Sequence, residues 1–451
     1  MKPSILILSY HFFPAPSVGA KRPTSLARAL ADNGYDVVVV ASKPKDPESR
    51  VADGVQMGQN IRVIHIWDPP SVEDSLFGAL RTLRGRFGVR RAKIEPETGT
   101  KTAAPGNRPT KERLAEKLLR HFHSLKLTFG TAKAWATLAF FRILPLRFSR
   151  QFDLIISSGP PMVAHISASL LKRVFRARHI IDLRDPWNEG PNQRSVYRSK
   201  ARLKLEDAVR RRCYAASELI VCASPGTQRT VQENWPSPSA NFRIILNGYD
   251  TVAEDPVPSP TGVLHILFAG TIYLNRDPFP LFHALAELLD DPLVDRSKVR
   301  LDMYGDCKTF ADIDLAQWLT QNGLSDCIFL HAPVSPKEIR EQIARSTVLL
   351  NFAQGQKNQI PAKTYEYLAT GRQTLVITEP DSDTASIVLK SGMGIIVPPD
   401  DPQLMRTTIR DLYEFFVTDK KTHQFSADNI DHFSRKAQNR LYLGAIEELV
   451  R

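Results

Sequence analysis

Short apolar runs alternate with helix-like stretches along most of this 451-residue chain, and this alternation constrains the fold more than any other feature. The run of valines at residues 37–40 is typical of them. Runs that are apolar at every position indicate strands buried on both faces of a parallel sheet, with helices as connections. A chain of this length also exceeds what one hydrophobic core usually supports, so we expect more than one domain.

The alternation occurs in two series with a proline-rich segment between them. The first series ends near Asp250, and the second begins at His265. Residues 251–262 hold several prolines, as an interdomain linker would. We therefore predict two doubly wound, Rossmann-like α/β domains, at residues 1–250 and 263–433.

Cysteine content and hydropathy point to a cytoplasmic protein. The four cysteines are scattered and form no C-x-x-C pair, which argues against a zinc site or a disulfide framework. The apolar run after Met1 is too short for a signal peptide, and no run reaches the roughly 18 apolar residues of a membrane span.

The positive charge is concentrated in one segment, a predicted insertion at about residues 71–150 of the first domain. Residues 81–150 contain 17 Lys or Arg and 4 Asp or Glu, a balance of 17 − 4 = +13, against +12 for the whole chain. Within it, residues 134–148 are apolar and aromatic with arginines at the edge. This composition suits a peripheral contact with an anionic membrane surface, on its inner face. The alternative is a core helix with a solvated basic flank.

A helix with a phosphate-binding end is predicted at residues 360–371, between two strand-like runs. Pro361 suits the first helical position, and Gly371 suits the residue just past the helix end. Free N–H groups near Ala362 would then attract phosphate. Glu366 lies about one turn in, where a carboxylate could reach a sugar hydroxyl; alternatively it only favours the helix dipole.

This stretch resembles the donor-site motif of glycosyltransferase family 4, which reads roughly K-x-x-E-Y-x-A-x-G before a hydrophobic strand. The resemblance implies a retaining, nucleotide-sugar-dependent enzyme with the GT-B fold, in which two domains face a cleft. In that fold residues 434–451 would form a helix crossing back to the first domain. Glu366 would bind the ribose. The family often has a second Glu eight residues earlier, where this chain has Asn358.

The resemblance also implies a set of donor-binding residues. After the glycine that follows the first strand of this domain, here Gly270, the family commonly has Arg and Lys on the donor diphosphate. Thr271 departs from that pattern, but Arg276 can serve as one cation and Lys363 as the other. The implied donor-binding set is Gly270, Thr271, Arg276, Asn358, Pro361, Ala362, Lys363 and Glu366.

Two stretches of the first domain are candidates for the acceptor side of the cleft. Gly19 could let the backbone approach a ligand beside Arg22, unless the pair is a turn glycine and a solvated arginine. Charged residues also crowd a strand end at residues 182–185, where the alternative is an ion pair between Arg184 and Asp185. The patterns P-x-x-G-x-x-R, S-S-x-P-P, D-L-R-D-P-W and N-G-x-D resemble family 4 enzymes as well, the second and third a subset acting on cell-surface glycans. The cleft candidates are His11, Gly19, Arg22 and Arg184.

The resemblance implies sugar transfer from a nucleotide-sugar, bound to the second domain, onto a glycan or lipid-linked acceptor in cell-surface polysaccharide synthesis. The catalytic candidates are Asp185 and Glu366, with His11 and His165 as alternatives to Asp185. Arg276 and Lys363 could neutralise the leaving diphosphate without a metal. We expect no cofactor and no metal, although residues 381–383 match the D-x-D of metal-dependent glycosyltransferases.

Two other functions are compatible with the same residues. The first is a sugar-nucleotide epimerase of the same fold, which product analysis would separate from a transferase. The second is a nucleic-acid-binding protein that uses the basic segment. The chain carries no recognisable nucleic-acid-reading motif, so we expect no nucleic acid among its partners.

Overall fold

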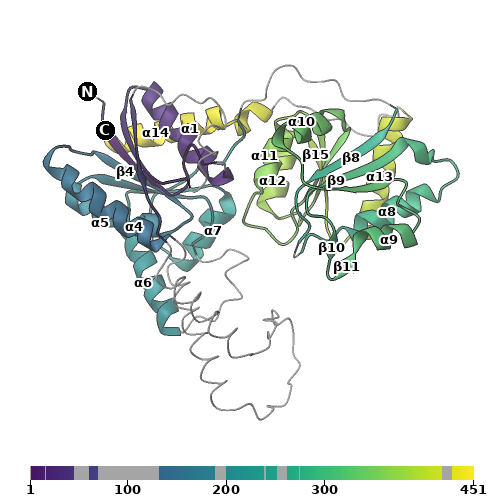
Figure 1. Ribbon diagram of the computed structural model, residues 1–451, viewed down its shortest axis with the longest axis horizontal. Coiled ribbons are helices and arrows are strands. Elements are labelled where there is room, and N and C mark those ends of the chain that lie inside the picture. The colour runs from purple at the N-terminus through teal and green to yellow at the C-terminus, as the bar shows by residue number, and fades with distance from the viewer. Residues whose placement is uncertain are drawn as a thin grey trace, which may run out of the picture. The chain divides into compact units, whose positions relative to one another are not determined.

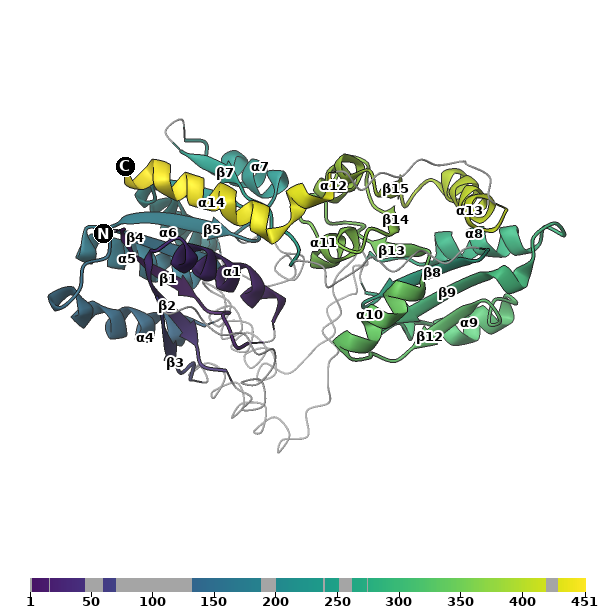
Figure 2. The ribbon, with the colours of Figure 1, turned by 90° about the horizontal axis from the view of Figure 1, so that it is seen from above.

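The computed structural model describes residues 2–15, 17–44, 60–69, 132–187, 200–237, 240–250, 262–273, 275–418 and 429–451. The chain divides into two compact units, each built on its own sheet (Figures 1 and 2). The first unit contains residues 1–223, 227–245 and 441–451, and the second contains residues 224–226 and 246–440. Most of the predicted basic insertion and of the predicted linker lies outside the described residues.

The first unit is a parallel sheet of seven strands in the order β3-β2-β1-β4-β5-β6-β7. The strands are β1 (Ser4–Ser9), β2 (Asp36–Ser42), β3 (Ile61–Ile66), β4 (Leu154–Gly159), β5 (Arg178–Leu183), β6 (Leu219–Cys222) and β7 (Phe242–Ile244). Alternate residues of β1 enter two different cores: Ile5 and Ile7 pack with one, and Leu6 and Leu8 with the other. Burial on both faces explains why the strands are apolar at every position.

Helices cover both faces of this sheet. One face carries α1 (Val18–Asp32) and the end of α14 (Arg435–Val450), whose Tyr442 and Ile446 join the core. The other face carries α4 (Lys133–Ile143) and α5 (Val163–Phe175). The remaining helices that the structure describes in this part of the chain are α6 (Lys200–Ala216), α7 (Pro225–Asn234) and the short η2 (Leu144–Phe148).

The second unit is a parallel sheet of six strands in the order β12-β9-β8-β13-β14-β15. The strands are β8 (Leu264–Ala269), β9 (Val299–Tyr304), β12 (Ile328–His331), β13 (Val348–Phe352), β14 (Gln373–Ile377) and β15 (Gly394–Val397). Apolar runs of the sequence predict all six at or close to these bounds, namely His265–Ala269, Arg300–Tyr304, Cys327–Leu330, Val348–Phe352, Leu375–Ile377 and Gly394–Val397. A small antiparallel pair, β10 (Thr309–Phe310) and β11 (Ile313–Asp314), was not predicted. Two doubly wound α/β sheets confirm the predicted fold class.

The helices of the second unit also form two layers. One layer is α8 (Phe279–Leu289), α9 (Leu315–Gln321) and α13 (Pro402–Val417). The other is α10 (Pro336–Arg345), α11 (Ala362–Leu368) and α12 (Asp383–Ser391). Pro361 is the N-cap of α11, with an extended ψ of 139°, so the helix begins one residue later than predicted. Gly371 has the expected left-handed backbone, with a φ of +66°.

The apolar stretch at residues 134–148 is a core helix on one side and exposed on the other. Trp135, Ala139 and Ile143 are buried in the first unit's core. Phe141 is 61% exposed and Phe148 is 91% exposed. This agrees with the alternative of a core helix with a solvated basic flank, since Arg142 and Arg147 are exposed, and the two phenylalanines are exposed beside them. Among the described residues, no helix is long and apolar enough to cross a membrane.

Candidate functional site

The candidate site lies in the second unit, where the order of the strands reverses. β8 pairs with β9 as far as its last residue, Ala269, but pairs with β13 only through Ile266 and Leu267. The two strands therefore separate toward their carboxyl ends, the place where doubly wound sheets bind ligands. The loop that follows β8 and the helix α11 both begin there.

Lys363 on α11 lies against the loop that follows β8. Its Nζ is 4.3 Å from the centre of the Phe268 ring, and it packs so closely on Gly270 that a Cβ there would collide with the ammonium. This Nζ is buried and has no hydrogen-bond partner among the described residues. Burial lowers the pKa of Lys363 to about 7, and the nearby charge of Arg276 acts in the same direction.

Arg276, the second predicted cation, is only 7% exposed. Its Nη1 donates to the carbonyl oxygen of Thr271 at 3.0 Å, and its guanidinium lies 4.3 Å from the centre of the Tyr273 ring. Its buried Nε has no acceptor in the described part of the chain. Burial lowers the pKa of Arg276. The structure thus brings together two buried cationic groups, and no carboxylate of the described residues is hydrogen-bonded to either.

The loop after β8 is held by backbone contacts. The Gly270 N–H donates to the Tyr304 carbonyl at 2.8 Å, and Gly305 approaches so closely that a Cβ there would collide with the Gly270 carbonyl. A hydrogen bond of 3.0 Å also runs from the Ile272 N–H to the Asp306 carbonyl. The loops after β8 and β9 therefore pack against each other at Gly270, which Lys363 also contacts.

Other predicted donor-site residues lie on or just before α11. Glu366 is exposed, and its charge opposes the lowering of the Lys363 pKa. Thr364 accepts a hydrogen bond of 2.9 Å from the Asn351 side chain, which ties α11 to β13. The carbonyl of Asn358 accepts a hydrogen bond from the Ser224 hydroxyl at 2.9 Å. Sequence reasoning missed both structural contacts, the second of which joins residues 134 positions apart.

The D-x-D match at residues 381–383 is occupied by structural contacts. Asp381 forms an ion pair of 3.0 Å with Lys357. The Ser382 side chain caps α12, and Asp383 is buried and accepts the Gly226 N–H at 2.6 Å. No cluster of three or more His, Cys, Asp or Glu suited to a metal ion occurs in the ranges that the structure describes.

In the first unit, Arg22 is buried rather than solvated, so the solvated-arginine alternative is wrong. Its Nη2 lies 2.6 Å from Asp182 Oδ1, and its Nη1 donates to the Ile245 carbonyl at 2.8 Å. Asp182 is 1% exposed and also accepts from the Ser158 hydroxyl at 2.9 Å. This ion pair joins α1 to β4 and β5, and its carboxylate was absent from the predicted site.

Three other predicted residues of the first unit, His11, Gly19 and Asp185, lie close to Arg184. Arg184 donates to the carbonyls of Gly19 at 2.5 Å and Gly159 at 3.2 Å, and also to that of Pro160. A Cβ on Gly19 would lie 3.3 Å from the His11 ring. Burial lowers the pKa of His11, with Arg184 acting in the same direction. Burial raises the pKa of Asp185, with Arg184 acting against it.

His165, the alternative catalytic residue, lies inside the core. Its Nδ1 is 2.8 Å from the Ser157 hydroxyl, which lies equally close to Nε2 of His179. Both histidines are completely buried. Burial lowers the pKa of His165 to about 3 and also lowers the pKa of His179. Both rings are therefore neutral parts of the core.

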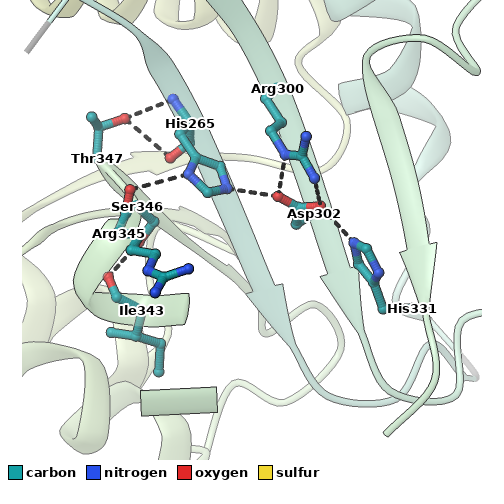
Figure 3. Close-up of polar contacts among 8 residues, drawn as sticks. All are labelled: His265, Arg300, Asp302, His331, Ile343, Arg345, Ser346 and Thr347. Carbon is teal, nitrogen blue, oxygen red and sulfur yellow. Dashed lines mark hydrogen bonds and ion pairs between the residues drawn. The ribbon is translucent and has the colours of Figure 1, made fainter. Parts of the chain in front are cut away.

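A second charged cluster of the second unit contrasts with the candidate site. Figure 3 shows Asp302 between His265, Arg300 and His331. His265 Nε2 and His331 Nε2 lie 2.7 and 2.5 Å from its oxygens, and Arg300 donates through Nε at 2.6 Å. Burial opposes the ionisation of Asp302, but these donors hold its pKa well below its usual range. Asp302 is thus satisfied within the protein.

Two doubly wound parallel sheets in one chain are the GT-B class of fold, and similar solved structures share it. They include sucrose-phosphate synthase from Thermosynechococcus elongatus (15% identity, 99% of each chain covered, TM-score 0.58). A glycosyltransferase from Rickettsia africae ESF-5 covers 100% of this chain and 99% of its own, at 12% identity and a TM-score of 0.61. Anabaena HepE in complex with UDP and glucose covers 99% of this chain and 100% of its own, at 13% identity and a TM-score of 0.57.

The sequence narrows this class to one family. Residues 19–248, more than half of the chain, match the family described as Glycosyl transferase 4-like domain. The chain belongs to this glycosyltransferase family, which confirms the predicted resemblance. A search of curated proteins found no significant match.

Proposed function

We propose that the protein transfers a sugar from a nucleoside-diphosphate sugar and that its second unit binds this donor. The observation that carries the proposal is the buried pair Arg276 and Lys363, which has no carboxylate partner among the described residues. A buried charge without a counter-charge is costly to the fold. A diphosphate would supply the missing anion to both cations.

The same two cations suit the chemistry of transfer. When the bond from the sugar to the diphosphate breaks, negative charge grows on the leaving oxygen, and fixed positive charge at that position lowers the barrier. Arg276 can bind two phosphate oxygens at once, whereas Lys363 acts as a point charge. Because α11 is only seven residues long, we assign the binding of the diphosphate to these two side chains and not to the N-terminus of the helix.

Further donor contacts follow from the same placement. Glu366, exposed on α11 three residues after Lys363, is proposed to accept hydrogen bonds from the ribose hydroxyls. Asn358 is proposed to face the transferred sugar in place of a carboxylate. The Anabaena neighbour, solved with UDP and glucose, supports a nucleotide-sugar as the donor class.

The acceptor is proposed to bind the first unit at the cluster of His11, Gly19 and Arg184. Asp185 follows this arginine, and burial raises the pKa of its carboxyl group, as suits a group that takes up a proton from an acceptor hydroxyl. We propose a glycan or lipid-linked acceptor of cell-surface polysaccharide synthesis. The support is the resemblance of the D-L-R-D-P-W stretch to enzymes that act on such glycans.

The donor assignment is tested by thermal shift with a panel of UDP-, GDP-, ADP- and dTDP-sugars, followed by product analysis with the best ligand. We expect at least one nucleotide-sugar to raise the melting temperature, and Arg276→Gln and Lys363→Met to abolish the shift. Arg296→Gln is the matched control, because this arginine of the same unit forms an exposed ion pair with Asp326. Equal shifts in all three variants would contradict the assignment, and an epimerised donor without transfer would identify an epimerase.

We further propose that turnover needs no metal ion, since two cations already face the leaving group. The Asp381 and Asp383 carboxylates are engaged by Lys357 and by the Gly226 N–H. Activity should therefore survive excess EDTA. Activity that vanished with EDTA and returned with manganese or magnesium would show that the assignment is wrong.

We propose that the exposed side of α4 and η2 binds peripherally to a membrane surface. Phe141 and Phe148 are exposed there beside exposed Arg142 and Arg147, and the sequence before α4 is strongly basic. We expect sedimentation with anionic vesicles that about 0.5 M salt weakens strongly. Phe141→Ser with Phe148→Ser should weaken it too, whereas Leu293→Ser, at an exposed apolar position of the second unit, should not. Equal recovery in the supernatant with and without anionic lipid would exclude this contact.

A further inference from the structure

The separation of β8 from β13 leaves one backbone donor of β8 without a strand partner. Along β8, the N–H of Gly270 faces β9 and donates to Tyr304. The N–H of Ala269 therefore faces the opposite side, where pairing with β13 has already ended at Leu267. The phenol oxygen of Tyr367 accepts this N–H at 3.0 Å. A side chain of α11 thus takes the place of a strand at the fork.

Tyr367 is held rigidly in this position. It is 2% exposed and packs on Leu267 of β8 and Leu349 of β13, one on each side of the fork. Burial raises the pKa of the phenol well above its usual value, so the group stays neutral. A phenol with a fixed ring and a fixed acceptor bond sets the distance between α11 and the end of β8.

That distance matters because the two cations lie on the two elements that the bond joins. Lys363 stands one helical turn before Tyr367 on α11, and Arg276 is on the loop that Ala269 begins. Lys363 contacts the same loop at Gly270. One diphosphate can satisfy both cations only while their spacing is kept.

We propose that Tyr367 is a positioning residue for the donor diphosphate: its hydrogen bond to Ala269 holds α11 and the loop after β8 at the spacing that lets Lys363 and Arg276 bind one ligand. Tyr367 itself touches no ligand in this scheme. The inference rests on the proposed function, because it names what fixes the geometry of the same site. The sequence motif around Glu366 does not indicate this role.

The experiment removes only the phenol oxygen and has a closely matched control. Tyr367→Phe keeps the packing of the ring and leaves the Ala269 N–H unpaired. Tyr413→Phe removes the same kind of bond elsewhere in the second unit, because the buried Tyr413 phenol accepts the Asp295 N–H at 2.9 Å. Affinities for UDP, GDP, ADP and dTDP are measured by calorimetry, with melting curves for each variant.

Both variants should lose similar stability, since each leaves one backbone N–H without its partner. Only Tyr367→Phe should lose affinity for the best diphosphate, by roughly tenfold, while Tyr413→Phe stays within about twofold of wild type. In a Lys363→Met background the Tyr367 change should cost less than about twofold, because positioning acts through that lysine. A tyrosine with a purely structural role would not show this coupling to Lys363.

The outcomes separate the two proposals. If Lys363→Met and Arg276→Gln weaken binding but Tyr367→Phe does not, the positioning role is wrong and the donor site stands. The positioning role is equally wrong if the effects of Tyr367→Phe and Lys363→Met on affinity are additive. If neither cation variant changes the affinity, or wild type binds none of the four diphosphates, both proposals are wrong.

Discussion

The buried cations of the two units differ in what surrounds them. In the first unit, Arg22 is paired with Asp182, and Arg184 donates to three backbone carbonyls. In the second unit, Arg276 keeps an unpartnered Nε and Lys363 an unpartnered ammonium within the described chain. A buried charge that the protein satisfies holds the fold together, whereas we propose that a ligand completes the two neighbouring cations that are left unsatisfied.

The difference belongs to the site and is not a property of the whole second unit. Asp302, in the same sheet as the site, is also buried, yet it accepts from His265, Arg300 and His331 (Figure 3). Two charged clusters of one sheet therefore differ in how fully their charges are paired. Burial alone would not separate them, and the presence or absence of hydrogen-bond partners does.

The largest effect is expected from breaking the satisfied pair. Asp182→Asn removes the counter-charge of Arg22, and an uncompensated buried charge typically costs about 3–5 kcal/mol of folding free energy. Urea unfolding should show this loss while affinity for nucleoside diphosphates is kept. Asp326→Asn is the control, because its exposed pair with Arg296 should contribute less than about 1 kcal/mol. A loss of donor affinity without a loss of stability would place Asp182 in a binding role.

The unsatisfied cation should respond in the opposite way. Lys363→Met removes a buried ammonium and keeps much of the side-chain volume, so the ligand-free protein should become more stable while diphosphate affinity falls. Charged hydrogen bonds contribute about 1.5–3 kcal/mol, so the affinity should drop roughly 10- to 100-fold. Calorimetry and melting curves measure both, and Lys357→Met, on a surface pair with Asp381, is the control.

The pH dependence sharpens this prediction. The pKa of Lys363, about 7 in the folded protein, lies below its unfolded value of 10.5, so the unfolded chain binds more protons between these values. Stability from this group therefore rises with pH through that window, and Lys363→Met should flatten the rise. If wild type and Lys363→Met show the same dependence of stability on pH, the ammonium is solvated in the folded protein.

The histidines give a third test, on the order of 2 kcal/mol for each ring. Burial holds the pKa of His165 near 3 and lowers that of His179, against an ordinary value of 6.5. Their stability contribution is complete above pH 6.5 and is lost as pH falls, by roughly 1.4 kcal/mol per pH unit for a group that titrates only when unfolded. Asp302, with its pKa lowered, keeps its contribution through this range. The first unit should therefore unfold at lower urea at pH 5 than at pH 7.

Tryptophan fluorescence can follow the two units separately. Four of the five tryptophans lie in the first unit and Trp318 lies in the second, so Trp318→Phe leaves a signal from the first unit alone. His165→Gln with His179→Gln should remove most of the pH dependence of that signal. An unchanged dependence in the double variant would assign the acid sensitivity to other groups.

The sequence predicted the sheets well and the partners of charged residues poorly. β13 was predicted at its observed bounds because a strand buried on both faces is apolar throughout. The two-residue strands β10 and β11 are too short to leave a period in the sequence. The pairing of Arg22 with Asp182 spans 160 positions, so local patterns carry no trace of it.

In the candidate site, too, the sequence predicted the local elements but not the partners of the charged residues. A local motif drew attention to Lys363 and Glu366, because both lie on one short helix beside a strand end. That Lys363 would be buried and unpartnered depends on Phe268 and Gly270, far away in the chain. Tyr367 belongs to the same motif, but its role was missed because a tyrosine on an apolar helix face has the same pattern as any core residue.

The smallest effect is expected at Glu366, whose carboxylate is exposed while the cations beside it are buried. If it accepts ribose hydroxyls, Glu366→Gln keeps shape and some hydrogen bonding, and Glu366→Ala removes both. Affinity for nucleoside diphosphates should then fall in the order wild type, Gln, Ala, by roughly tenfold for each 1.4 kcal/mol lost. Stability should change little, because an exposed glutamate near a helix start contributes well below about 1 kcal/mol. Calorimetric titration alongside melting curves measures both, and unchanged affinity in Glu366→Ala would reduce Glu366 to a partner of the helix dipole.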